Sequence, residues 1–390
     1  MNRYLSIDVL RGLIMVIMAI DHSLGAWSVT KDYFPEIGLP FEGATQTIYT
    51  RYADSWTQFS RVLTHVCAPG FQLLAGLGLA ISVARSRRQG GSEFKISGDM
   101  VIRGVILILC DWFIMRFAYG NIPFIWLVLC CIGAAMICFS VLRFLPLVLI
   151  GGFSVALIVL QPLYCPTVLL PASADIYLST IWHRVALGDT FTVLYPIIPW
   201  LGIFGLGWVL GTIYERYSLE RFRWLIPLGI GLMLIGLGLR WFGGTYADRM
   251  PDGAAGPWTA TYWVWSKYPP SLVFMLTTVG WLLLMLGLFR PLDFQESPSP
   301  NWQYLAVLGR VALFFYVVHF FFYGATWLAY SKWHEAYHYD QAFLKPTGYA
   351  AKVPLAWAYL IWVIGLLIVW PLCRWYDGMR QKHKKLLRYF

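Results

Sequence analysis

Charged residues are scarce in this chain of 390 residues, and their scarcity excludes an ordinary water-soluble protein. Only 13% of the residues are charged, 58% are hydrophobic, and the mean hydropathy is +0.60. A soluble domain carries roughly 25% charged residues, because its surface must face water. The sequence therefore predicts a protein whose main solvent is lipid.

Cysteine is also sparse, and its spacing excludes a disulfide framework and a structural zinc site. Six of the seven cysteines fall inside long apolar runs, and only Cys165 lies in a connection expected outside the membrane. No internal repeat is convincing, although Arg11 with His22 and Arg310 with His319 give two helices a faint similarity. The apolar N-terminal segment lacks a small-residue cleavage site, so we interpret it as a retained first helix.

Ten apolar runs are long enough to cross about 30 Å of hydrocarbon at about 1.5 Å per residue. We therefore predict an all-α fold, a polytopic transmembrane bundle of about ten helices that forms one integral membrane domain over residues 1–390. The predicted spans are 5–27, 60–84, 98–118, 121–142, 146–164, 191–213, 221–241, 271–292, 303–328 and 352–374.

The basic residues predict how these spans are oriented. With the N-terminus inside, the inner segments hold 16 Lys and Arg and the outer segments hold 11, although the inner connections are much shorter. By the positive-inside rule, both termini are expected in the cytoplasm. Four longer outer connections are rich in Tyr, Trp, Pro and Gly, so we expect the substrate-facing loops there. The net charge of +10 then reflects topology and anionic lipid head groups rather than nucleic acid.

Ionisable residues within the spans mark candidate functional groups, because charges in lipid are costly unless they face protein or water. The first span carries Asp8 and Arg11 near its inner end, one turn apart, where the two side chains can pair. A pair that only fixes helix packing is the structural alternative. Asp21 and His22 lie about three turns further on, near the outer end of the same span.

Three histidines are expected at a similar depth near the outer face. His65 lies close to the outer start of the second span, and His319 lies well into the outward-running ninth span, so both are level with His22. Neutral imidazole accepts a proton from a hydroxyl or an amine near neutral pH, which suits general-base catalysis. A buried carboxylate such as Asp21 can tune that base. One lone histidine is as often an interhelical hydrogen bond, but three together favour a site.

The start of the sixth span is a candidate substrate contact. Residues 195–202 include two prolines, which remove backbone donors and leave carbonyls that must find partners or line a cavity. Tyr195 and Trp200 are therefore placed at a broken helix entrance. The alternative is a simple kink, with Trp200 in the interfacial aromatic belt.

A short zinc-protease pattern also occurs near the C-terminal end. His334, Glu335 and His338 match H-E-x-x-H, which on a helix gives two imidazole ligands and a carboxylate base. The match falls in a loop and lacks a third ligand at zincin spacing, so these residues are only a weak metal candidate, and we expect no metal.

Several segments together resemble the transmembrane acyltransferase superfamily, in particular bacterial relatives of heparan-alpha-glucosaminide N-acetyltransferase. The first-helix signature is Leu-Ser-Ile-Asp-Val-Leu-Arg-Gly at 5–12, followed by Asp21 and His22. The resemblance spans almost the entire chain. Its further motifs are similar to 63–69, 74–76, 195–202 and 308–319.

The resemblance implies a membrane enzyme that takes an acyl group, usually acetyl from cytoplasmic acetyl-CoA, and passes it to a sugar or amino sugar outside a bacterial inner membrane. Arg11 would match the first-helix arginine of the family, and His22 the histidine of the bacterial pattern. The lysosomal member lacks a histidine at the position of His22 and has its reactive histidine in the following loop. Which histidine acts here therefore stays open.

This interpretation divides the candidate residues by membrane face. The expected catalytic residues are His22, His65, His319 and Asp21, and the expected donor-side residues are Asp8, Arg11 and Arg310. Direct transfer in a ternary complex and transfer through an acetyl-imidazole both remain open. A proton-coupled transporter or exporter is the main alternative, because it would use the same intramembrane charges, and a zinc protease is the third. We expect acyl-CoA, a saccharide acceptor and the lipid bilayer as partners, and the sequence leaves a homodimer open.

Overall fold

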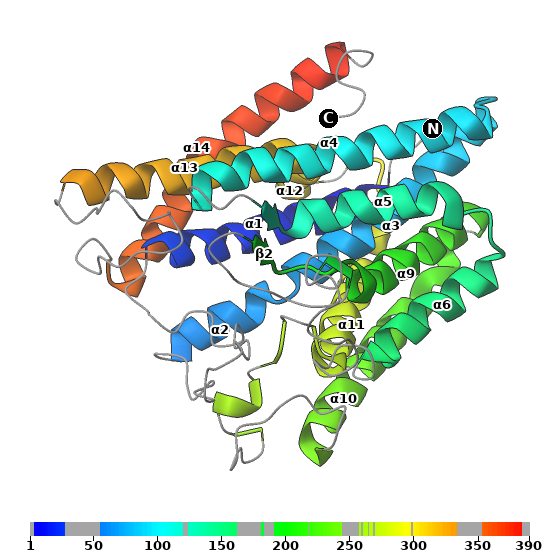
Figure 1. The fold of residues 1–390 in the computed structure, drawn as a ribbon, viewed down its shortest axis with the longest axis horizontal. Helices are drawn as coiled ribbons and strands as arrows, with labels where there is room; N and C mark the ends of the chain where they lie inside the picture. The colour runs from blue at the N-terminus through cyan, green and yellow to red at the C-terminus, as the bar shows by residue number, and fades with distance from the viewer. Residues whose placement is uncertain are drawn as a thin grey trace.

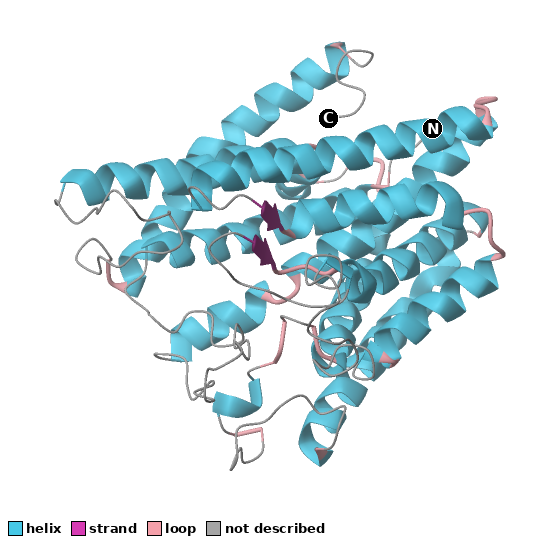
Figure 2. Cartoon of the chain, viewed as in Figure 1, coloured by secondary structure: helices cyan, strands magenta, loops and turns pink. Residues whose placement is uncertain are grey.

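The computed structural model describes residues 4–27, 55–119, 124–161, 181–182, 191–217, 219–243, 257–258, 260–263, 265–267, 270–297, 299–333 and 353–383. Nearly all of the regular structure in these residues is helical (Figure 1, Figure 2). Seven of the described helices are long and apolar enough to cross a membrane. The prediction of an all-α, polytopic helix bundle is therefore confirmed.

Helix α1 (Leu5–Trp27) forms the centre of the bundle. In its most apolar stretch 67% of the residues are buried inside the protein, so this helix faces other helices more than lipid. A span with four ionisable residues needs such a position, because charges exposed to lipid are costly. The helices packed against α1 are α2 (Ser55–Thr64), α3 (Cys67–Arg88), α11 (Leu272–Phe289), α12 (Pro300–Arg310), α13 (Ala312–Trp333) and α14 (Leu355–Lys382).

The remaining helices extend the bundle on one side of α3 and α11 (Figure 1). Helix α9 (Ile197–Arg216) packs along α3 and against α6 (Leu147–Val159), and α10 (Leu225–Phe242) packs along α11. Helix α4 (Glu93–Tyr119) pairs with α5 (Val128–Leu142). Short 3₁₀ helices are η1 (Leu219–Trp224), η2 (Ala260–Trp263) and η3 (Arg290–Phe294).

The predicted second span is two helices rather than one. Helix α2 ends at Thr64 and α3 begins at Cys67, so the chain breaks at His65 and Val66. Pro69 explains the break, because a proline ring inside a helix clashes with the carbonyl four residues earlier, which here belongs to His65. The break leaves His65 at a corner between the two helices.

The predicted ninth span is also interrupted, at Val311 between α12 and α13. Both helices nevertheless lie alongside α1 with nearly the same offset in residue number. His22 contacts His319 and Arg11 donates to the Gly309 carbonyl, pairs that are 297 and 298 positions apart in sequence. The near-constant offset means that α12 and α13 run parallel to α1. The helices approach closely here, because a Cβ at Gly309 would lie 1.9 Å from the Asp8 carbonyl oxygen.

Two three-residue strands hold the start of α9 beside α5. Strands β1 (Phe124–Trp126) and β2 (Phe191–Val193) pair in parallel. The Leu194 amide donates to the Trp126 carbonyl at 3.1 Å, and the Trp126 indole N–H donates to the Tyr195 carbonyl at 3.1 Å. These bonds fix the chain just before the two prolines at the start of α9.

Candidate functional site

His22 and His319 form the centre of the candidate site. His22 Nδ1 lies 2.7 Å from His319 Nε2, and the two rings stack with centroids 4.9 Å apart. Phe320 and Tyr316 contact the His22 ring edge to face. His319 is buried, whereas His22 keeps part of its surface exposed, so His22 is the member of the pair that a substrate can reach.

The hydrogen bonds of this pair assign its protons. His319 Nδ1 lies 2.7 Å from the Phe315 carbonyl oxygen, and since a carbonyl oxygen only accepts, His319 Nδ1 must carry a proton. In a neutral His319 ring, Nε2 then has a lone pair and accepts from His22 Nδ1–H. The tautomer that fits both bonds leaves a lone pair on His22 Nε2.

Asp21 is held by side chains of α2. Its carboxylate accepts from the Arg61 guanidinium at 2.5 Å and from the Thr64 hydroxyl at 3.1 Å. The Arg61 side chain is fully buried in the protein, and Asp21 is 9% exposed. These contacts join α1 to α2, and the expectation that Asp21 tunes His22 stays a prediction.

His65 belongs to the same end of the bundle but not to the stacked pair. It is buried at the corner between α2 and α3, and neither ring nitrogen has a hydrogen-bond partner among the described residues. Its ring packs on Trp265 and Phe274, with centroids 5.9 and 5.4 Å away. The structure therefore brings two of the three predicted histidines into contact and sets the third beside an aromatic wall.

Tyr195 and Trp200 continue that aromatic wall. Their rings lie 5.1 Å apart, and Trp200 lies 6.2 Å from Phe274. Trp200 is completely buried, so it is not part of an interfacial belt. Its indole N–H has no partner in the described part of the chain, whereas the buried amide of Gln72 lies against the Cys131 thiol. Buried polar groups left unpaired in this way indicate a bound water or a ligand.

The predicted donor-side residues lie at the opposite end of α1. Arg11 pairs with Asp8 at 3.3 Å and donates to the Gly309 carbonyl at 3.1 Å. Arg310 pairs with Asp377 of α14 at 2.7 Å. The side chains of both arginines are about one-fifth exposed, at 21% and 22%. Each guanidinium is thus fixed by a carboxylate and still accessible from one side.

The weak metal candidate, His334, Glu335 and His338, lies outside the described residues. Within the described part of the chain, no group of three or more His, Cys, Asp or Glu side chains is placed to hold a metal ion.

Sequence reasoning missed three residues of these networks. Arg61 is an arginine four residues before His65 in an apolar context, which is the same signal that singled out Arg11. Asp377 and Gln72 were harder to predict, because their partners, Arg310 and Cys131, lie on other helices far away in sequence. Their positions depend on how α14 and α3 rotate in the bundle.

The bundle, with histidines at one end and paired arginines at the other, has the helices of a multi-pass membrane protein. The family model of the heparan-alpha-glucosaminide N-acetyltransferase catalytic domain matches residues 44–239, and the chain belongs to this family. The match includes His65 and Trp200 and excludes His22 and His319. No curated protein sequence matches the chain.

Proposed function

We propose that this protein moves an acetyl group from cytoplasmic acetyl-CoA to a sugar or amino sugar on the other side of a bacterial inner membrane. The observation that carries the proposal is the His22–His319 pair. His22 Nδ1–H donates to His319 Nε2, and His319 Nδ1–H donates to the Phe315 carbonyl oxygen. Family membership supports acetyltransferase chemistry in general. The whole chain acts as one unit, with both termini in the cytoplasm, as the distribution of basic residues favours.

His22 Nε2 is the proposed general base. It removes the proton from the amine or hydroxyl of the acceptor while that atom attacks the acetyl carbonyl carbon. The new C–N or C–O bond forms as the C–S bond of the thioester breaks, and the proton on His22 then passes to the departing CoA thiolate. His319 does not touch the substrate; it holds His22 in the tautomer that leaves Nε2 free.

Acetyl-CoA fits the opposite end of α1 as a substrate. Its phosphates need cations, and the partly exposed guanidinium groups of Arg11 and Arg310 supply them. Asp8 and Asp377 keep those guanidinium groups oriented. The thioester then reaches along α1 toward His22.

The acceptor is proposed to bind near His65. Sugars combine apolar ring faces with hydroxyl groups, and the aromatic wall of Trp265, Phe274 and Trp200 suits the former. The unpaired nitrogens of His65 and Trp200 suit the latter. Tyr195 packs on Trp200, and Asp21 pairs with Arg61, four residues before His65, so both support this aromatic wall.

The test is incubation of the purified protein with labelled acetyl-CoA and a panel of amino sugars, muropeptides and lipid-linked sugars. Wild type should release CoA and yield a labelled acceptor, and His22→Ala should slow release by roughly 10² to 10⁴, the usual contribution of a general base. The control is His383→Ala, because His383 is exposed at the far end of α14. Unchanged turnover in His22→Ala would contradict the assignment. A pH-dependent solute flux in proteoliposomes without CoA would favour a transporter instead.

A further inference from the structure

In the inner half of α14, one face packs against the rest of the bundle. Tyr376 stacks on Phe314 with centroids 4.2 Å apart, and Asp377 pairs with Arg310 at 2.7 Å. Cys373 on the same face is fully buried. These contacts fix how α14 is rotated about its axis, and they leave its other face pointing away from the protein, at the margin of the bundle (Figure 1).

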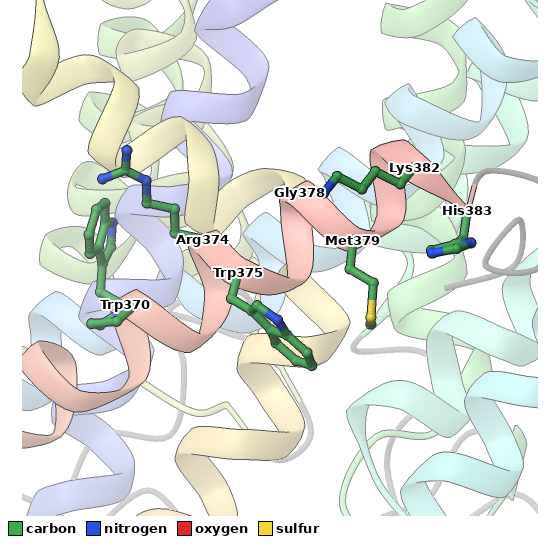
Figure 3. A pocket seen from close by; sticks show the side chains of 8 residues that line it. Trp370, Arg374, Trp375, Gly378, Met379, Lys382 and His383 are labelled. Carbon is green, nitrogen blue, oxygen red and sulfur yellow. The ribbon is translucent and has the colours of Figure 1, made fainter.

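Beside the packed face, α14 carries two adjacent rows, each with a spacing of four residues. Most of their side chains are exposed, whereas Trp370 packs on Tyr304 of α12 and Met379 packs against the core. Together the two rows line a hollow of about 650 Å³ (Figure 3). The first row is Trp370, Arg374, Gly378 and Lys382, and the second row is Pro371, Trp375, Met379 and His383.

Two cations stand over this hollow without an acidic partner. Arg374 and Lys382 are exposed, and neither forms an ion pair within the described residues. The Arg374 guanidinium lies 5.6 Å from the centre of the Trp370 ring, a contact that leaves its N–H groups available for an anion. By contrast, Arg11 of α1, Arg61 of α2, Arg87 and Arg88 of α3 and Arg310 of α12 each hold a carboxylate.

Gly378 lies between these two cations in the first row. A glycine inside a helix destabilises it by about 1 kcal/mol relative to alanine, so its presence calls for a reason. At Gly12 the reason is packing, since a Cβ there would lie 1.8 Å from the Leu305 carbonyl oxygen. At Gly378 no atom of the described residues lies within 4 Å of such a Cβ. The bare backbone leaves room for an anionic group one turn before Lys382 and one turn after Arg374, whose guanidinium lies beside Trp370 (Figure 3).

The surroundings of the hollow are those of a lipid site and not of a soluble anion. Only 17% of the most apolar stretch of α14 is buried, so this helix faces the bilayer. Leu367 is 69% exposed and Ile368 47% exposed, one turn before Trp370 on the same side. Trp375, at 61% exposure, is an amphipathic ring of the kind that settles at head-group depth.

We propose that this face of α14 binds an anionic phospholipid, with the phosphate over Gly378 between Arg374 and Lys382 and the acyl chains along Leu367 and Ile368. Charge complementarity selects the head group. The exposed apolar side chains of Leu367 and Ile368 offer a contact surface to acyl chains, so this site favours a lipid over free phosphate. The site is separate from the acetyl transfer and does not depend on it.

The experiment is native mass spectrometry of the detergent-purified protein with added phosphatidylglycerol or phosphatidylcholine. Wild type should retain phosphatidylglycerol in preference to phosphatidylcholine. Each cation contributes roughly fivefold in affinity, so Arg374→Gln with Lys382→Gln should lower phosphatidylglycerol binding roughly 25-fold. Gly378→Leu should lower it too, by filling the space at Gly378, although leucine is a good helix former and keeps the fold.

Two matched variants control for general effects. Lys95→Gln removes an exposed cation elsewhere, and Gly231→Leu fills a glycine in α10 that also has no described neighbour within 4 Å of its Cβ. Both should bind lipid as wild type does. Equal retention of the two lipids, or full retention in both α14 variants, overturns the proposal. Displacement of the bound lipid by millimolar inorganic phosphate also overturns the proposal. So does a wild-type dimer that Gly378→Leu separates into monomers, if those monomers bind no lipid.

Discussion

His319 shows how a residue that does not meet the substrate can control one that does. Replacing His319 with alanine removes the acceptor of the His22 Nδ1 proton, so His22 can turn or change tautomer. We expect kcat to fall roughly 10-fold to 100-fold, with the KM for acetyl-CoA unchanged. His319→Gln restores an oxygen acceptor near the same position and should recover much of the rate. Equal losses in both variants would contradict a positioning role.

The Asp21–Arg61 pair predicts an asymmetric cost of mutation. Both groups are buried and their atoms lie 2.5 Å apart, so Arg61→Met takes this cation away from a buried carboxylate. Breaking a buried pair costs roughly 3–5 kcal/mol, whereas removing both charges is often neutral. Thermal unfolding in detergent should show a large fall in Tm for Arg61→Met and recovery in Asp21→Asn with Arg61→Met. A double variant as unstable as the single one would contradict this account.

At this scale, sequence predicted local pairs better than distant ones. Asp8 and Arg11 are three residues apart on one helix, and their ion pair was predicted and is seen. The partner of Asp21 is 40 positions away on another helix, which periodicity in one sequence does not reveal. The His22–His319 contact was predicted only as a shared depth, while its hydrogen-bond direction depends on the Phe315 carbonyl.

Among the elements, the first turn of α4 is tied to α3 and to the end of α5 by one carboxylate. Glu93 accepts from Arg87 at 2.7 Å and also pairs with Arg143, whose side chain is buried. The Arg87 hydrogen bond is the main cause that lowers the pKa of Glu93 to about 2. The Glu93 side chain is 45% exposed, so water screens part of this attraction.

Because the folded pKa of Glu93 is lowered, its ion pairs stabilise the protein fully above the ordinary glutamate pKa. That stabilisation is lost as the pH falls through about 2. We expect Glu93→Gln to lower Tm at pH 7 by roughly 1–3 °C. The difference from wild type should shrink steadily below about pH 4. A Tm difference that stays constant down to pH 3 would contradict this assignment.

The sequence contains a visible cause for only one of the two helix breaks. Pro69 explains the corner at His65, and the proline was visible in the sequence, although a continuous span was predicted. The break at Val311 has no proline or glycine at the position itself, and nothing in the structure explains it. The apolar runs still located the helices well, since lipid selects for length and hydropathy more strongly than for local propensity.

For the whole molecule, the predicted orientation can be tested by labelling. The six described native cysteines are buried or half-buried, so their background reaction should be low, and Cys165, which is expected outside, is replaced by serine in every labelled variant. We expect Gln89→Cys and His383→Cys to react with an impermeant maleimide only after the membrane is opened. Trp258→Cys, exposed in the connection between α10 and α11, should react in intact cells. The reverse pattern would contradict cytoplasmic termini.

The common register of α1 with α12 and α13 has a mechanical consequence. The Arg11–Gly309 bond joins one end of α1 to α12, and the His22–His319 contact joins the other end of α1 to α13. A slide of α1 past these two helices by a single turn, about 5.4 Å, would break both contacts together. At Gly309 the backbones of α1 and α12 are too close together to allow such a slide. Any opening that admits a substrate must therefore come from other helices moving around a rigid α1–α12–α13 unit.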